Sequence, residues 1–149
     1  MKPSNRTFTL TIVISGVLAA VVIYSLAKSK PSHVIRVNGE NRGLQTAIDE
    51  AKKGMPEFER RLANPKPDEK FAVKGTFYTP QGKEYLWVRS PKLDKGIFSG
   101  ILDQKPIALV GKKFGDPITV PEKESVDWLI KDSDGMHGAY TEKALLDQQ

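Results

Sequence analysis

Residues 71–89, FAVKGTFYTPQGKEYLWVR, decide the fold. The apolar or small residues Phe71, Val73, Gly75 and Phe77 alternate with Ala72, Lys74 and Thr76. After a Pro80-Gln81-Gly82 turn, Tyr85 and Trp87 oppose Leu86 and Val88 over Glu84 to Arg89. Alternation with a period of two on both sides of a proline and glycine turn is typical of half-buried strands. The stretch therefore predicts an antiparallel β-hairpin.

Upstream of this hairpin the apolar residues change to a helical period. They are Leu44, Ala47, Ile48, Ala51, Met55, Phe58 and Leu62. This spacing predicts an amphipathic helix with one apolar stripe. Gly54 and Pro56 interrupt the pattern, and proline has no N–H for a helix interior. We therefore expect two helical pieces, Leu44 to Lys53 and Pro56 to Ala63, with Pro56 in the first turn of the second.

Downstream of the hairpin, short apolar runs predict further strands. They are Gly96 to Leu102, Ile107 to Val110, Ile118 to Val120, and a last hairpin of Val126 to Lys131 and Met136 to Tyr140 around Asp134-Gly135. A short helix from Glu142 to Leu146 is expected to begin with Thr141 as its cap. Helices followed by a run of strands indicate an α+β fold, with one or two helices packed on a strongly bent antiparallel sheet. A small half-open barrel is the alternative form of this sheet.

The N-terminal part of the chain contains an apolar run, Phe8 to Leu26, without a charged residue. Nineteen residues of helix measure about 28 Å, close to the ~30 Å hydrocarbon core of a bilayer. The run predicts a single transmembrane helix that precedes the folded body. We therefore divide the chain into an anchor or signal at 1–27, a linker at 28–43 and one α+β domain at 44–149.

Whether this segment is retained is open from the residues alone. Ser25-Leu26-Ala27 places small residues three and one before a possible cut at Lys28, as signal peptidase requires. The apolar run is longer than the ~7–15 residues of a signal-peptide core, which favours a retained anchor. Basic residues flank both ends of the run, so the positive-inside rule does not decide orientation. The short leader before the run favours a body outside the cytosol.

The charge of the chain argues against a nucleic-acid partner. The formal net charge is +5, but the first thirty residues hold four basic residues and no acid, leaving 19 basic and 18 acidic residues in the remainder. Phosphate binding requires a clustered basic surface, whereas the charges along the predicted helix alternate in sign. The chain has no cysteine, which excludes disulfides and thiolate metal ligands. We expect no cofactor.

Several short motifs resemble the YegJ-like family of small bacterial proteins, a domain of unknown function. They are Phe71-Ala72-Val73-Lys74, Glu84-Tyr85-Leu86-Trp87-Val88, Phe98 with Gly100, Gly115-Asp116, Val126-Asp127-Trp128 and Gly138-Ala139-Tyr140-Thr141. The resemblance covers about Leu44 to Leu146. It implies an α+β fold and a bacterial source, and it implies no reaction. Together with the apolar run and its short leader, it leads us to expect a single-pass protein of the inner (cytoplasmic) membrane with a periplasmic or extracellular body.

Five residues form the candidate ligand-binding set: Trp87, Glu84, Asp127, Trp128 and Tyr140. Asp127 beside Trp128 is the sharpest feature, because an acid next to a large aromatic ring can have a raised pKa or form a ligand platform. The alternative is that Trp128 belongs to the core while Asp127, on the other face, binds a turn. Trp87 with Glu84 has the same two interpretations, since aromatic residues within strands usually pack.

No motif specifies catalysis or a metal. Asp132-Ser133-Asp134-Gly135 begins like a calcium loop but lacks the downstream glutamate and flanking helices, so a hairpin turn is favoured. His33 and His137 are the only histidines, too few and too separated for a two-histidine metal site. A trio of Ser133, His137 and Asp127 has no oxyanion feature beside it.

These observations lead to three functional hypotheses. The first is a non-enzymatic binding module on a membrane anchor, with another protein or a cell-envelope component as its ligand. The second is a small hydrolase-type enzyme that uses Asp127, Glu84 or His137, which requires these side chains to meet in one pocket. The third is an immunity-like inhibitor of a toxin, suggested by the small size of the domain.

Overall fold

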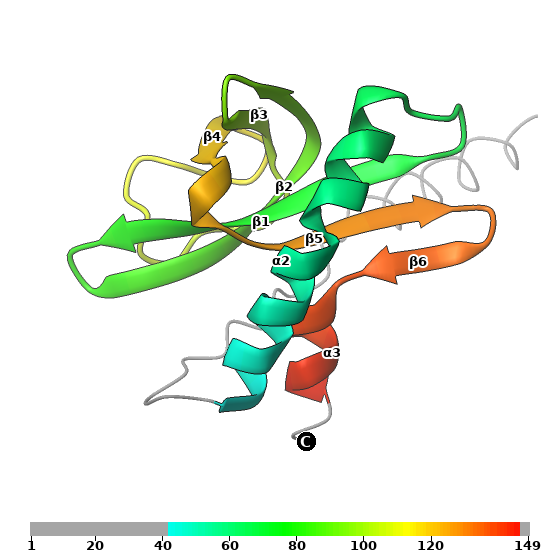
Figure 1. The fold of residues 1–149 in the computed structure, drawn as a ribbon. Helices are drawn as coiled ribbons and strands as arrows, with labels where there is room; N and C mark the ends of the chain where they lie inside the picture. Colours follow the sequence, from blue (N-terminus) through cyan, green and yellow to red (C-terminus); the bar gives the residue numbers. More distant parts are fainter. Residues whose placement is uncertain (1–41, 147–149) are drawn as a thin grey trace, which may run out of the picture. The chain divides into compact units, whose positions relative to one another are not determined.

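The computed structural model describes residues 42–146, which form two helices and one antiparallel sheet (Figure 1). The predicted anchor Phe8–Leu26 and the linker up to residue 41 lie outside the described residues. Within residues 42–146, no helix combines the length and apolar character of a membrane span.

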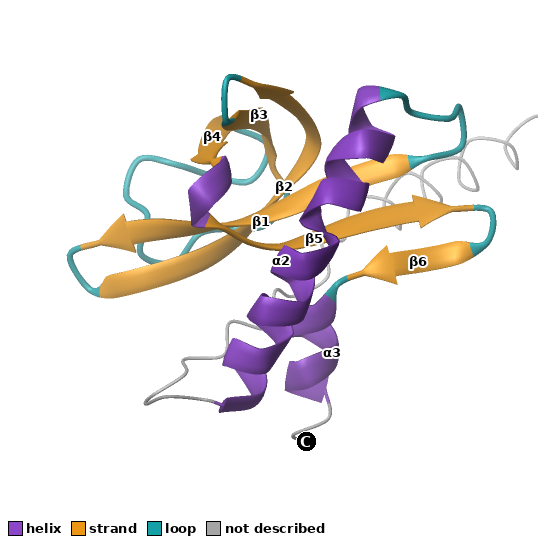
Figure 2. Ribbon diagram, in the orientation of Figure 1, coloured by secondary structure: helices purple, strands orange, loops and turns teal. Residues whose placement is uncertain are grey.

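Helix α2, Arg42–Ala63, opens the described chain, and six strands with a 3₁₀ turn and a short helix follow (Figure 2). Their bounds are β1 Lys70–Thr79, β2 Gly82–Asp94, β3 Ile97–Leu102, β4 Pro117–Pro121, η1 Glu122–Glu124, β5 Ser125–Asp132, β6 Gly135–Gly138 and α3 Tyr140–Leu146. The predicted hairpin of residues 71–89 is thus confirmed as β1 and β2. The strands expected near 96–102 and 118–120 and the last hairpin are also present.

The sheet is open, with the strand order β4-β3-β2-β1-β5-β6. Its expected bend is present: β2 changes direction at Ser90 and Pro91, where its register with β3 shifts and Ser90 has φ +50°. The bend brings β4 back toward β1, because a Cβ placed on Gly75 would lie 2.5 Å from Cγ1 of Val120. The two edge strands, β4 and β6, do not pair with each other, so the sheet is not a closed barrel.

Helix α2 is continuous, and the predicted division into two pieces is wrong. Pro56 lies inside it, and the Trp128 ring packs against Gly54, where a Cβ would come within 2.6 Å of Cζ2. The indole Nε1 of Trp128 donates a hydrogen bond of 2.8 Å to the carbonyl oxygen of Ala51. Proline and glycine each disfavour a helix interior, but this contact and the burial of the apolar stripe hold the helix together.

The core lies between α2 and the facing side of the sheet, which α2 crosses in Figure 1. Phe58 of α2 is fully buried at its centre. Its ring centroid lies 5.9 Å from that of Phe71, 6.1 Å from Phe98 and 5.7 Å from Trp128. Aromatic pairs at these separations contribute beyond the area they bury. This contact joins α2 to strands β1, β3 and β5.

Two further expectations are wrong. Residues 107–110 are not a strand but part of the connection between β3 and β4. The last strand ends at Gly138, and α3 already begins at Tyr140, so Thr141 lies inside the helix rather than capping it. In both places a distant carboxylate binds the backbone amides, as described below.

Candidate functional site

Trp87, Lys74 and Asp127 are direct neighbours across three adjacent strands. Lys74 of β1 pairs with Trp87 of β2 on one side and with Asp127 of β5 on the other. Successive side chains of a strand point to opposite faces, and the following or preceding residues Val73, Val88 and Trp128 belong to the core. The trio therefore lies on the sheet face away from α2, where α3 meets it. We call Lys74, Trp87, Asp127, Thr141 and Glu142 the lysine cluster.

Asp127 has no exposed surface, and its carboxylate holds the start of α3. Oδ1 accepts hydrogen bonds from the backbone N–H of Trp128 at 2.8 Å and of Tyr140 at 3.2 Å. Oδ2 accepts from Thr141 twice, from the N–H at 2.8 Å and from the hydroxyl at 2.6 Å. The first amides of a helix lack partners within the helix, and here a carboxylate from a neighbouring strand satisfies two of them.

Lys74 is 6% exposed, and its ammonium group has three partners around it. Nζ donates to the Thr141 hydroxyl at 2.9 Å and to Oε1 of Glu142 at 2.6 Å. It also lies 4.9 Å from the centroid of the Trp87 ring, whose Nε1 donates to the same Glu142 oxygen at 2.9 Å. A buried ammonium requires a compensating anion and hydrogen-bond acceptors, and α3 supplies both.

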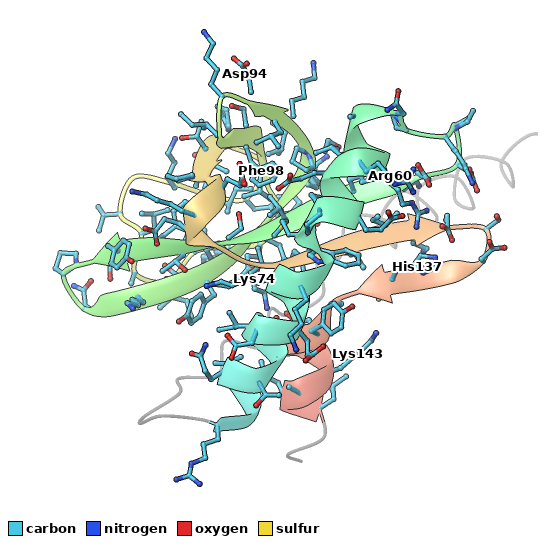
Figure 3. All side chains as sticks on the ribbon, in the orientation of Figure 1. Arg60, Lys74, Asp94, Phe98, His137 and Lys143 are labelled. Carbon is cyan, nitrogen blue, oxygen red and sulfur yellow. The ribbon has the colours of Figure 1, made fainter. Side chains whose placement is uncertain are left out.

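The lysine cluster contains a chain of hydrogen bonds from Lys74 through the Thr141 hydroxyl to Asp127. A hydroxyl between a lysine and a carboxylate is a chemical arrangement that can activate a nucleophile. Thr141, however, is only 2% exposed, and its hydroxyl already accepts from one neighbour and donates to the other. In this arrangement the three groups hold α3 on the sheet. Figure 3 draws the side chains and labels Lys74 where the strands pass α2.

The Glu84 carboxylate, near the start of β2, also binds backbone amides of a distant segment. It is 7% exposed, and its carboxylate accepts hydrogen bonds from three consecutive backbone N–H groups. The donors are Ile107 at 2.6 Å, Ala108 at 3.0 Å and Leu109 at 2.9 Å. These amides cannot then pair with a strand, which explains why residues 107–110 form no strand.

His137 belongs to a separate group of charges at the β5–β6 hairpin. Its Nε2 lies 3.0 Å from Oδ2 of Asp132, which also accepts from Nη2 of Arg61 at 2.6 Å. The Arg61 guanidinium and, to a lesser extent, His137 lower the pKa of Asp132 to about 2. Arg61 also binds Glu69. These contacts join the end of α2 to the hairpin.

The turn within this hairpin has the structure expected for Asp132-Ser133-Asp134-Gly135. Oδ1 of Asp132 accepts from the backbone N–H of Asp134 at 3.0 Å and of Gly135 at 3.1 Å. The carboxylate thus stabilises the turn that reverses the chain. No group of histidine and acidic residues within 42–146 is arranged to hold a metal ion.

The structure brings together only part of the expected set. Trp87 and Asp127 meet through Lys74 and α3, whereas the Tyr140 ring packs 5.8 Å from Trp128 beside the core. Glu84 instead binds the connection between β3 and β4. Sequence reasoning missed Lys74 and Glu142. Lys74 alternates with apolar residues, which is also the pattern of a solvent-facing lysine, so no local signal marks it as buried.

Comparisons with known proteins agree with the resemblance noted in the sequence. The family described as "Uncharacterized protein conserved in bacteria (DUF2314)" matches residues 41–149. The chain is 24% identical over 107 residues to the uncharacterized protein YegJ of Escherichia coli strain K12, an alignment that covers 72% of this chain and 69% of that protein. No solved structure matches the chain.

Proposed function

We propose that this chain, which belongs to the DUF2314 family of bacterial proteins, is a non-enzymatic binding module on a membrane anchor. Residues 8–26 would form the anchor, residues 28–43 the linker, and the α+β body would face the cell envelope. Its ligand would be another protein or a component of the envelope. The uncharged length of the run Phe8–Leu26 supports the anchor.

One observation carries the binding-module proposal: the two most buried candidate acids accept hydrogen bonds from backbone amides. Asp127 and Glu84 each accept hydrogen bonds from three backbone N–H groups. A carboxylate with three backbone partners fixes the shape of the segment that it binds, because charge-assisted hydrogen bonds are stronger than neutral ones. The fold thus uses both acids to present α3 and the β3–β4 connection, which supports recognition rather than turnover.

The hydrolase alternative has less support. It requires Asp127, Glu84 and His137 in one pocket, yet among the described residues each has its own separate partners. These are the start of α3 for Asp127, residues 107–109 for Glu84 and Asp132 for His137. An immunity-like inhibitor would use the same presented surfaces and differ only in having a toxin as its ligand.

Two measurements on the full chain in bacterial cells test the proposal. Protease treatment of intact spheroplasts should degrade the body, and the mass of the mature chain should include residues 1–27. Protection in intact spheroplasts with cleavage only after lysis would place the body in the cytosol and contradict the proposal. A cytosolic marker protein in the same sample serves as the control for intact membranes.

The second measurement tests binding against turnover. A photo-crosslinking residue at Val110, which is 88% exposed, should form a defined adduct in the envelope fraction. The same residue at Asp134, on the β5–β6 turn, is the matched control and should give none. Turnover of a small substrate by the purified chain, abolished by Asp127→Asn without loss of folding, would refute the non-enzymatic proposal.

A further inference from the structure

The connection between β3 and β4, residues 103–116, exposes apolar side chains to an unusual degree. We call it the β3–β4 loop; it is the yellow stretch between these strands in Figure 1. Val110 is 88% exposed, Ile107 63% and Phe114 49%, and residues 110–115 are all exposed. Single exposed apolar residues are ordinary, but three on one short loop indicate a surface that contacts something apolar.

The fold holds this loop in a defined shape. Its base is closed by hydrogen bonds of 2.9 Å from the Leu102 N–H to the Asp116 carbonyl and from the Gly115 N–H to the Leu102 carbonyl. The Glu84 carboxylate binds residues 107–109, and the Asp116 carboxylate accepts from the Lys113 N–H at 3.0 Å. Leu109 packs against the core while Val110 points to solvent. The apolar residues of the loop therefore divide into some that face the core and some that face solvent.

The loop also carries three lysines between its two ends. The loop contains Lys105, Lys112 and Lys113, and its two acids, Asp103 and Asp116, lie at its ends. Asp103, at the edge of the loop, pairs with Arg89 at 3.1 Å. Across residues 42–146, none of the three lysines takes part in a salt bridge. Their charge is therefore available to an anionic partner.

Exposed apolar residues beside uncompensated lysines match the chemistry of an anionic bilayer surface. Apolar side chains enter the boundary between headgroups and acyl chains, while lysines reach the lipid phosphates. The predicted anchor ends at Leu26, and fifteen residues separate it from α2. Fully extended, they span about 50 Å, so the anchor would keep the loop at a high effective concentration near lipid.

We propose that the β3–β4 loop docks on anionic phospholipid, with Ile107, Val110 and Phe114 in the interface and the lysines on the phosphates. This inference rests on the proposed function and deepens it, because it names the envelope component that the module binds. A protein ligand would equally use the apolar residues. The lysines of the loop and the tether to the predicted anchor are what favour lipid.

The test uses the full chain in lipid nanodiscs with an environment-sensitive dye at one position. Because the chain has no cysteine, Val110→Cys gives a unique labelling site. Met136→Cys, an exposed apolar residue on β6, is the matched control. Nitroxide-labelled lipid should quench the dye at position 110 in discs containing phosphatidylglycerol and much less in phosphatidylcholine discs. The dye at position 136 should respond equally to both.

Charge removal provides the second measurement. Lys105 and Lys113 make no side-chain hydrogen bond within residues 42–146, so K105Q/K113Q leaves the loop contacts intact. Each replacement should lower the docking equilibrium constant about fivefold in anionic discs. High salt should reduce quenching in the parent chain in the same direction.

The outcomes separate this inference from the proposed function. If the chain stays in both kinds of disc but the dye at position 110 remains in water, lipid docking is overturned, and a protein becomes the occupant of the loop. If neutral discs do not retain the chain, the anchor proposal fails. Quenching in anionic discs would then still support lipid docking by the loop, and its absence would overturn it.

Discussion

Replacing Asp127 with asparagine removes the charge that holds α3 on the sheet while keeping the shape of the side chain. The carboxylate accepts four hydrogen bonds, from the N–H groups of Trp128, Tyr140 and Thr141 and from the Thr141 hydroxyl. An amide has one oxygen to accept with and one nitrogen that can only donate. In its best orientation the oxygen faces Trp128 and Tyr140, and the nitrogen faces the Thr141 N–H.

The expected loss of stability follows from this count. At least one buried N–H loses its acceptor, which costs about 1–3 kcal/mol. The remaining bonds lose the assistance of a charge, which makes each of them weaker, and Lys74 loses a nearby anion. We expect Asp127→Asn to lower the free energy of unfolding by about 2–4 kcal/mol, a large part of the ~5–15 kcal/mol of an ordinary domain.

Urea denaturation followed by the fluorescence of Trp87 and Trp128 measures this change. Asp134→Asn, at an exposed turn position, is the matched control and should change stability by less than about 0.5 kcal/mol. Hydrogen exchange at the Thr141 amide gives a local measurement, because this N–H should lose protection first. An unchanged unfolding midpoint together with unchanged protection of that amide would refute the assigned role of Asp127.

Three further perturbations test other contacts. Glu84→Gln should accelerate amide exchange at residues 107–109 and lower stability by about 1–3 kcal/mol; unaltered exchange would contradict the role of that carboxylate. The pKa of Asp132 lies near 2, so the stability it contributes is complete above its ordinary value of 3.8 and is lost as the pH falls toward 2. Asp132→Asn should therefore flatten the dependence of the urea midpoint on pH in this range. Gly54→Ala should destabilise the fold through a clash with Trp128 at 2.6 Å, despite the ~1 kcal/mol that alanine gains in a helix; a more stable variant would disprove that packing.

The local pattern of apolar residues was sufficient to predict the strands. It was insufficient for segments whose backbone amides bind side chains far away in the sequence. Alternation of apolar residues located β1 and β2 because each lies half-buried against one core. Residues 107–110 have the same apolar character, but their amides bind Glu84, 23 positions earlier in the chain. No window around residue 107 contains that information.

The helix was misjudged for a related reason. Gly54 and Pro56 are unfavourable in an isolated helix, yet Gly54 provides the space into which the Trp128 ring fits. The same explanation applies to the lysine cluster. Asp127 was singled out from its neighbour Trp128, whose backbone N–H it does bind, but its other partners lie at the start of α3. One of the two interpretations of Asp127 from the sequence was that it binds a turn, and the structure shows it binding the start of helix α3.

The position of β1 in the sheet has a consequence for the order of folding. β1 pairs with β2 across a tight turn but with β5 across about fifty residues of chain. Closing the larger loop costs more entropy, so the local meander of β1 to β4 should form before β5 pairs with β1. Until Trp128 has been synthesised, its indole ring cannot pack against Gly54 of α2. During synthesis the segment from Ser125 onward therefore completes a structure that the earlier part cannot finish alone.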